Sequence, residues 1–258
     1  NSYCDLLFYV NASKTIEEPN DRPVITPDDG NEPEKPDVTE TKTGTLAFED
    51  IWPGGGDYDM NDVIVEYNRA VSFDKKNQVT KIVDTFTPVH DGAVFANAFA
   101  YQVDKGQFGK MTFSATTEGI HTESATSSII VCPNVKQAIQ KVYTITREFT
   151  GGSFNKKDLK SYNPYIIVKY AEGQKGRTEV HLPKHEATSL ADLSLAGTQK
   201  DAYYIDKEGA YPFAIDIPIL NFISVTEKKS IDTEYPNFKA WADSKGEKYT
   251  DWYNNHVN

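Results

Sequence analysis

Six side chains with oxygen donors lie close together in the first quarter of this 258-residue chain. They are Glu49, Asp50, Asp57, Asp59, Asn61 and Asp62. The glycines Gly54–Gly56 separate the first two from the other four, and the β-branched run Val63–Val65 follows. Carboxylate and amide oxygens beside a flexible turn are what a hard cation such as calcium needs. The segment therefore predicts a calcium site with these six side chains as candidate ligands.

The spacing within this segment, residues 49–62, explains how the ligands would converge. Asp57, Asp59 and Asn61 alternate, so their side chains share one side of an extended backbone. Glu49 and Asp50 can fold back across the glycine turn. We call residues 49–62 the acidic loop and expect it to supply most of the oxygens that calcium requires.

The acidic loop is not an EF-hand, because Asp62 stands where that loop needs glycine and Asn68 where it needs glutamate. The alternative without a metal is a turn held by hydrogen bonds from Asp and Asn side chains. We favour a bound cation because so many close carboxylates repel one another without a counter-charge.

No other group of residues predicts catalysis. His181 and His185 are four residues apart, but Pro183 between them argues against a zinc-binding helix face, and structural or surface roles are favoured. Gly54–Gly56 lacks the Lys-Ser/Thr of a phosphate loop, and no Gly-x-Ser-x-Gly motif is present. We therefore expect a protein that is not an enzyme. A glycoside hydrolase with an unrecognised carboxylate pair is the less favoured alternative.

Aromatic side chains offer a different route to ligand binding. A sugar could stack on a platform of Tyr203, Tyr204, Trp241, Trp252 and Tyr253. Core packing of the terminal helices is the favoured interpretation of these rings. A carbohydrate-binding module of a glycan-handling surface system is therefore the alternative function.

Composition limits the class of protein. The net charge of −11, without a dense cluster of Lys and Arg, argues against nucleic-acid binding. No apolar run approaches the length of a transmembrane helix. The chain starts without Met or a visible signal peptide, so we expect a processed or recombinant fragment. Cys4 and Cys132 are the two cysteines, and their spacing leaves open whether they pair.

The chain divides into three parts. Residues 1–12 hold an apolar strand that echoes the start of the strand at Asp62, so we expect the terminal strand of a truncated preceding module. Residues 13–43 combine prolines with acidic residues and predict an extended, mobile linker. Residues 44–258 predict a mainly β domain, a jelly-roll-like β-sandwich with short C-terminal helices.

Alternation and turn residues locate the elements of this domain. The expected strands are Gly44–Glu49, Val63–Phe73, Val79–Pro88, Ala93–Tyr101, Lys110–Thr117, Val142–Phe149, Tyr165–Tyr170 and Thr178–Leu182. A short helix is expected at Asn134–Gln140 and a long surface loop at Thr188–Gly209. The expected terminal helices are Ser230–Tyr235, Phe238–Asp243 and Tyr249–His256.

The motifs resemble those of the LruC-domain family of bacterial surface proteins. The resemblance rests on Phe48–Pro53, the glycines, Asp57–Asp62, Glu179–Pro183 and Ala214–Pro218, and it extends over about residues 44–258. Lys184 departs from the family, which usually has glycine there. Cys4–Val10 resembles the end of a related calcium-associated β module, with Cys4 in place of the usual Asn.

The resemblance implies a secreted or outer-surface protein, often anchored by a lipid attached upstream, and it implies no reaction. Asp57, Asp59, Asn61 and Asp62 match the family motif and inherit the ligand role, and Glu49 and Asp50 match its Phe-Glu-Asp part. We therefore expect a non-enzymatic, calcium-stabilised surface module for adhesion or ligand binding. Its expected partner is an extracellular protein or a glycan.

Overall fold

The computed structural model describes residues 38–54, 56–149, 154–160, 162–173, 176–194 and 211–257. All of them belong to one unit, which starts at Pro36. The strand predicted in residues 1–12, the linker as far as residue 37, Cys4, Tyr203 and Tyr204 lie outside the described residues. No helix among the described residues combines the length and the apolar character needed to span a membrane.

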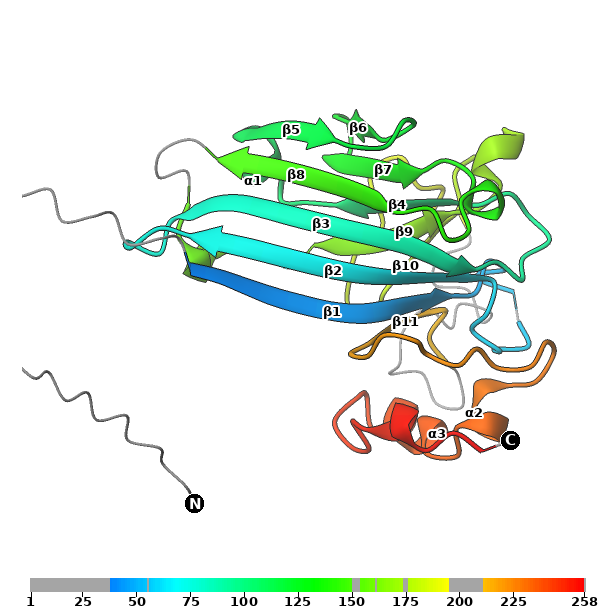
Figure 1. Ribbon diagram of the computed structural model, residues 1–258. Coiled ribbons are helices and arrows are strands. Elements are labelled where there is room, and N and C mark those ends of the chain that lie inside the picture. The colour runs from blue at the N-terminus through cyan, green and yellow to red at the C-terminus, as the bar shows by residue number, and fades with distance from the viewer. Residues whose placement is uncertain are drawn as a thin grey trace, which may run out of the picture. The chain divides into compact units, whose positions relative to one another are not determined.

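The described residues form two antiparallel β-sheets that face each other as two layers (Figure 1). The first sheet contains, in spatial order, β11 (Ala214–Ile217), β1 (Val38–Phe48), β2 (Val63–Phe73), β3 (Val79–His90), β8 (Tyr143–Phe149) and β5 (Met111–Ala115). The second contains β10 (Glu179–His181), β9 (Asn163–Ile167), β4 (Ala98–Gln102), β7 (Ser128–Cys132) and β6 (His121–Glu123). The predicted β-sandwich is confirmed.

The helices are short. They are α1 (Lys105–Phe108), α2 (Ile231–Glu234) and α3 (Phe238–Asp243), with 3-10 turns η1 (Val135–Gln137), η2 (Lys156–Asp158), η3 (Tyr170–Glu172) and η4 (Trp252–Asn254). The predicted helical ending therefore exists, and the helix expected at Asn134–Gln140 is the single turn η1.

The inner faces of the two sheets enclose the main core. Along β2, Val63, Val65 and Tyr67 point into it at every second position, as a half-buried strand requires. A polar layer lies beside this core, where Asp84 of β3 accepts from Arg69 Nε and Arg147 Nη2, each at 2.8 Å. All three side chains are buried, so the layer depends on this mutual pairing.

A second core lies on the outer face of the first sheet. Residues 219–257, which we call the C-terminal cap, pack aromatic rings against the outward side chains of β1, β2 and β11. Figure 1 shows α2 and α3 beside the β11 end of this sheet. Trp252 is 3% exposed and contacts Phe222, Tyr235 and Phe238. The favoured interpretation of this aromatic ring, core packing, agrees with the structure.

Two differences from the predicted elements have clear causes. β1 begins at Val38 rather than Gly44, because Thr39, Thr41 and Thr43 extend the pairing with the long strand β2. The last residues of the predicted linker are therefore part of the sheet. β7 was not predicted, because Ser128–Cys132 is buried on both faces and shows no polar alternation.

Candidate metal centre

The acidic loop connects β1 to β2 at one end of the first sheet. Glu49 follows β1 directly, and its backbone N–H donates to the Phe213 carbonyl at 2.8 Å. The C-terminal cap closes the loop from the other side, where Lys228 N–H donates to Asp59 Oδ2 at 2.8 Å. Segments distant in sequence therefore hold the carboxylates in place.

Three of the six predicted ligands converge. Glu49, Asp57 and Asp59 each offer an oxygen, and these three oxygens lie within 4.8 Å of one another. We call these three residues the acidic centre. Glu49 is 0% exposed and Asp59 is 2% exposed, whereas Asp57 faces solvent. The centre is therefore closed on the protein side and open to water at Asp57.

One oxygen of the acidic centre lacks a hydrogen-bond donor. Glu49 Oε1 accepts from Met60 N–H at 2.5 Å, but Oε2 is buried and has no hydrogen-bond partner among the residues that the structure describes. A Cβ atom at Gly56 would stand 2.7 Å from Oε2, so glycine leaves the space beside this oxygen open. A buried carboxylate oxygen without a donor is costly, and a cation would compensate it.

Electrostatics point the same way. Burial, and then the charges of Asp62, Asp59 and Asp57, raise the pKa of Glu49 to about 9. Burial and the nearby Asp50 charge raise the pKa of Asp62 to about 7. Burial is also the main cause of the raised pKa of Asp59. These acids therefore oppose one another's ionisation unless a cation is bound, and their oxygen ligands suit a hard cation rather than zinc or copper.

The other three predicted ligands have structural partners. Asp50 Oδ2 accepts from Asn97 Nδ2 at 2.7 Å, and Asp62 Oδ2 accepts from Asp50 N–H at 2.8 Å. Asn61 Nδ2 donates to the Val225 carbonyl at 3.2 Å. The charge of Asp62 acts on the acidic centre by raising the pKa of Glu49. Asp50 and Asn61 connect the loop to other segments.

The backbone conformation of the acidic loop explains why the acidic centre does not include every predicted ligand. Tyr58 and Met60 have positive φ angles of 57° and 54°, so the loop turns at these positions and is not extended. The extended backbone assumed for Asp57, Asp59 and Asn61 is therefore not present, and the ligand role of Asn61 stays a prediction. That side chain points instead toward Gly92 and Val225.

Sequence reasoning missed Asn97. This residue precedes β4, is fully buried, and accepts from Lys169 N–H at 3.1 Å while it donates to Asp50. It joins the acidic loop to the second sheet. Its neighbours Ala96 and Ala98 gave no signal of this role, because both partners are distant in sequence.

His181 occupies a buried network. Its ring stacks on Tyr165 at a centroid distance of 4.4 Å, and its two nitrogens lie 2.8 Å from Asn163 Oδ1 and 2.9 Å from Glu179 Oε2. Burial opposes ionisation of Glu179, but hydrogen bonds from His181 and Thr188 outweigh it and lower its pKa. The favoured structural role for His181 agrees with this position.

Comparisons with known proteins complete the description. No curated protein matches the chain. A crystal structure described as a "putative lipoprotein" from Bacteroides ovatus has a TM-score of 0.59 and 17% sequence identity, and the match covers 86% of this chain and 75% of that chain. At this identity the likeness concerns the fold alone.

The family comparison matches residues 77–253 to a model described as "Domain of unknown function (DUF4842)". This stretch is more than half of the chain, and the acidic loop precedes it. The chain belongs to the DUF4842 family.

Proposed function

We propose that this protein is a non-enzymatic extracellular module whose acidic centre binds calcium and thereby stabilises the fold for adhesion or ligand binding. The observation that carries the proposal is the buried Glu49 Oε2, for which the described part of the chain offers no hydrogen-bond donor; Glu49 lies beside Asp57 and Asp59. A bound cation would compensate this oxygen and the two further carboxylates together.

Calcium fits this centre better than the other common divalent cations. Calcium takes about 6–8 oxygen ligands in flexible geometry, including bidentate carboxylates and water. Glu49, Asp57 and Asp59 supply carboxylates, and the exposed position of Asp57 admits water. Magnesium demands a stricter octahedral arrangement and usually retains several waters, so a half-buried centre favours calcium.

The contacts around the centre give the ion a structural role. Lys228 N–H donates to Asp59, and Ile231 N–H donates to the Tyr58 carbonyl at 2.8 Å. Both donors belong to the C-terminal cap. An ion at the centre would therefore hold the acidic loop in the conformation that the cap recognises.

Two considerations support a surface location. The motifs resemble those of the LruC-domain family, and the fold resembles a protein described as a lipoprotein. In this proposal an upstream lipid anchors the protein to the outer surface. The partner is an extracellular protein or glycan.

Calorimetric titration with calcium, together with melting curves in calcium, magnesium and EGTA, tests the proposal. We expect heat of binding and a melting temperature that rises with calcium concentration, because the ion binds only the folded state. Asp59→Asn should reduce both effects, and Asp74→Asn, at an acid in the β2–β3 turn, serves as a control. Identical melting curves in calcium and EGTA would remove the metal from the proposal.

A further inference from the structure

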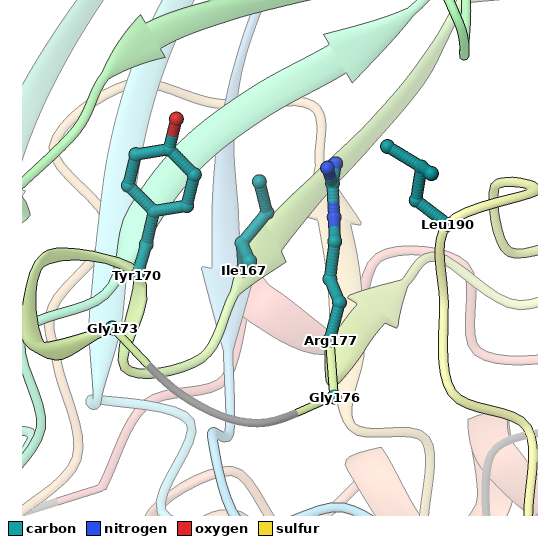
Figure 2. A pocket seen from close by; sticks show the side chains of 6 residues that line it. All are labelled: Ile167, Tyr170, Gly173, Gly176, Arg177 and Leu190. Atoms are coloured by element: carbon teal, nitrogen blue, oxygen red, sulfur yellow. The ribbon is translucent and has the colours of Figure 1, made fainter.

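A pocket of about 420 Å³ lies on the second sheet, away from the acidic centre. It is lined by Ile167, Tyr170, Gly173, Gly176, Arg177 and Leu190 (Figure 2). Its size falls within the range of about 300–1,000 Å³ that is typical of small-molecule sites. The volume is near the lower limit, so it suits one or two small rings.

The floor of the pocket belongs to the outer face of the second sheet. Ile167 ends β9 and packs with Ala98, Ala100 and Ile130, whereas its neighbour Ile166 packs into the main core. The pocket is therefore not a gap in the sandwich interior. It is a surface feature with an aliphatic floor.

An aromatic ring and an aliphatic side chain form the walls. Tyr170 is half-buried, packs against the cluster below, and presents its ring beside Ile167 in Figure 2. Leu190 lies next to Arg177 and is 45% exposed. These walls offer apolar contact to one face of a ligand.

The charge of Arg177 is already compensated. Its Nη1 donates to Glu123 Oε1 at 2.7 Å, and its Nε lies 2.6 Å from Glu179 Oε1. Two carboxylates therefore face one guanidinium, so an anionic ligand gains no net attraction. The oxygens of these two carboxylates also pair with Thr126, His181 and Thr188, so they are turned to protein partners and not to a cationic ligand.

Hydrogen-bonding capacity nevertheless remains. Arg177 carries five N–H groups. Its Nη1 donates to Glu123 and its Nη2 to the Tyr165 hydroxyl, whereas the buried Nε forms an ion pair with Glu179 but no hydrogen bond among the described residues, so one N–H on each Nη remains. The Tyr170 hydroxyl has no hydrogen-bond partner among the described residues. The pocket thus combines an apolar wall with uncharged and charge-compensated hydrogen-bonding groups.

We propose that this pocket binds a neutral saccharide ring that stacks on Tyr170 and accepts hydrogen bonds from Arg177. A sugar ring has a C–H face for the aromatic wall and hydroxyl groups for the remaining donors. A flat aromatic ligand would occupy the wall but leave those donors unpaired, which is unfavourable. The inference rests on the ligand-binding part of the proposed function, for which it names a ligand class and a site, and it does not depend on the metal site. It also assigns sugar binding to residues other than the aromatic platform that the sequence offered as the less favoured interpretation.

Saturation-transfer NMR on the full 258-residue chain tests the proposal. The probes are methyl glycosides of glucose, galactose, mannose and N-acetylglucosamine, with glucuronate, glucosamine and indole for comparison. We expect at least one neutral glycoside to receive saturation, and we expect the same result in EGTA. The charged sugars should bind more weakly than the neutral sugar of the same configuration.

Substitutions at Tyr170 locate the site. Tyr170→Ala should abolish the glycoside signal, and Tyr170→Phe should weaken binding about three- to tenfold, the effect of one neutral hydrogen bond. The control is Tyr249→Ala, which removes a tyrosine that is 50% exposed in the C-terminal cap. Melting curves of each variant verify folding, and Tyr170→Phe keeps the packing of the ring.

Three results would overturn the proposal. They are no saturation of any glycoside, a glycoside signal that survives Tyr170→Ala, and binding of indole alone. The melting temperature could depend on calcium while no glycoside binds. That result would support the metal site and refute the saccharide site.

Discussion

Replacing Glu49 by Gln should change stability in opposite directions with and without calcium. Gln keeps an oxygen that can accept from Met60 N–H but cannot ionise, so it needs no proton to be neutral at the buried Oε2 position. Without metal, the variant should be more stable than the natural protein. With calcium, it should lose most of the stabilisation that the ion supplies, because one of three carboxylates in the acidic centre is gone.

The magnitude follows from the raised pKa of Glu49. Burial and neighbouring charges raise it from 4.5 to about 9, so the metal-free protein must take up a proton on folding at neutral pH. The stability that such a group contributes is fully present at pH values below the pKa of the unfolded state. It is lost progressively as the pH rises from that pKa toward the pKa of the folded state. At pH 7 the loss is about 3 kcal/mol, from roughly 1.4 kcal/mol per pH unit. Gln does not titrate and avoids this loss.

The measurement is a set of melting curves between pH 5 and pH 8 in EGTA and in calcium. In EGTA at pH 7, Glu49→Gln should melt about 6–12 °C higher, at about 2–4 °C per kcal/mol for a domain of this size. Calcium at a hundred times its dissociation constant should raise the unfolding free energy of the natural protein by about 2.7 kcal/mol. The gain for the variant should be much smaller. The matched control is Glu118→Gln, which makes the same change at an exposed position.

Two outcomes would refute this reasoning. Destabilisation of Glu49→Gln in EGTA would mean that the carboxylate has a favourable partner in the metal-free state. A calcium-induced shift equal to that of the natural protein would mean that Glu49 is not a ligand.

Four further results are expected. Asp84→Ala should destabilise the fold by about 3–5 kcal/mol in denaturant titrations, because it leaves Arg69 and Arg147 buried without their shared carboxylate. Burial opposes ionisation of Asp84, but the two arginines outweigh it and lower its pKa, so its contribution should be complete above about pH 4 and fall in acid unfolding below that pH. Trp252→Ala should lower the unfolding free energy by about 3–5 kcal/mol, because the ring is buried in the cap core. Cys132 should react with iodoacetamide only after unfolding, because the thiol is buried and burial raises its pKa to about 11.

Local sequence was sufficient for elements whose pattern is local. The alternation in Val63–Phe73 gave the bounds of β2, and the aromatic spacing gave the bounds of α3. It failed at Ser128–Cys132, where burial on both faces removes the alternation that identifies a strand. It also placed the start of β1 too late, because the pairing of Val38 with Phe73 is a contact between distant residues.

The same division applies to the acidic centre. The sequence by itself determined that six oxygen-bearing side chains lie within one loop beside three glycines, and that they would repel one another without a cation. It could not determine which of them converge. That choice depends on the left-handed backbone at Tyr58 and Met60, and on partners such as Asn97 and Val225 that only folding brings near.

The sequence therefore determined which oxygen-bearing side chains the acidic loop offers. The tertiary structure determined which of them form the acidic centre. Glu49, Asp57 and Asp59 form the acidic centre, whereas Asp50 and Asn61 connect segments of the fold. The physical reason is that residue type sets the available donors locally. Whether such a side chain can bind an ion or instead forms a hydrogen bond with the protein depends on contacts between residues far apart in the chain.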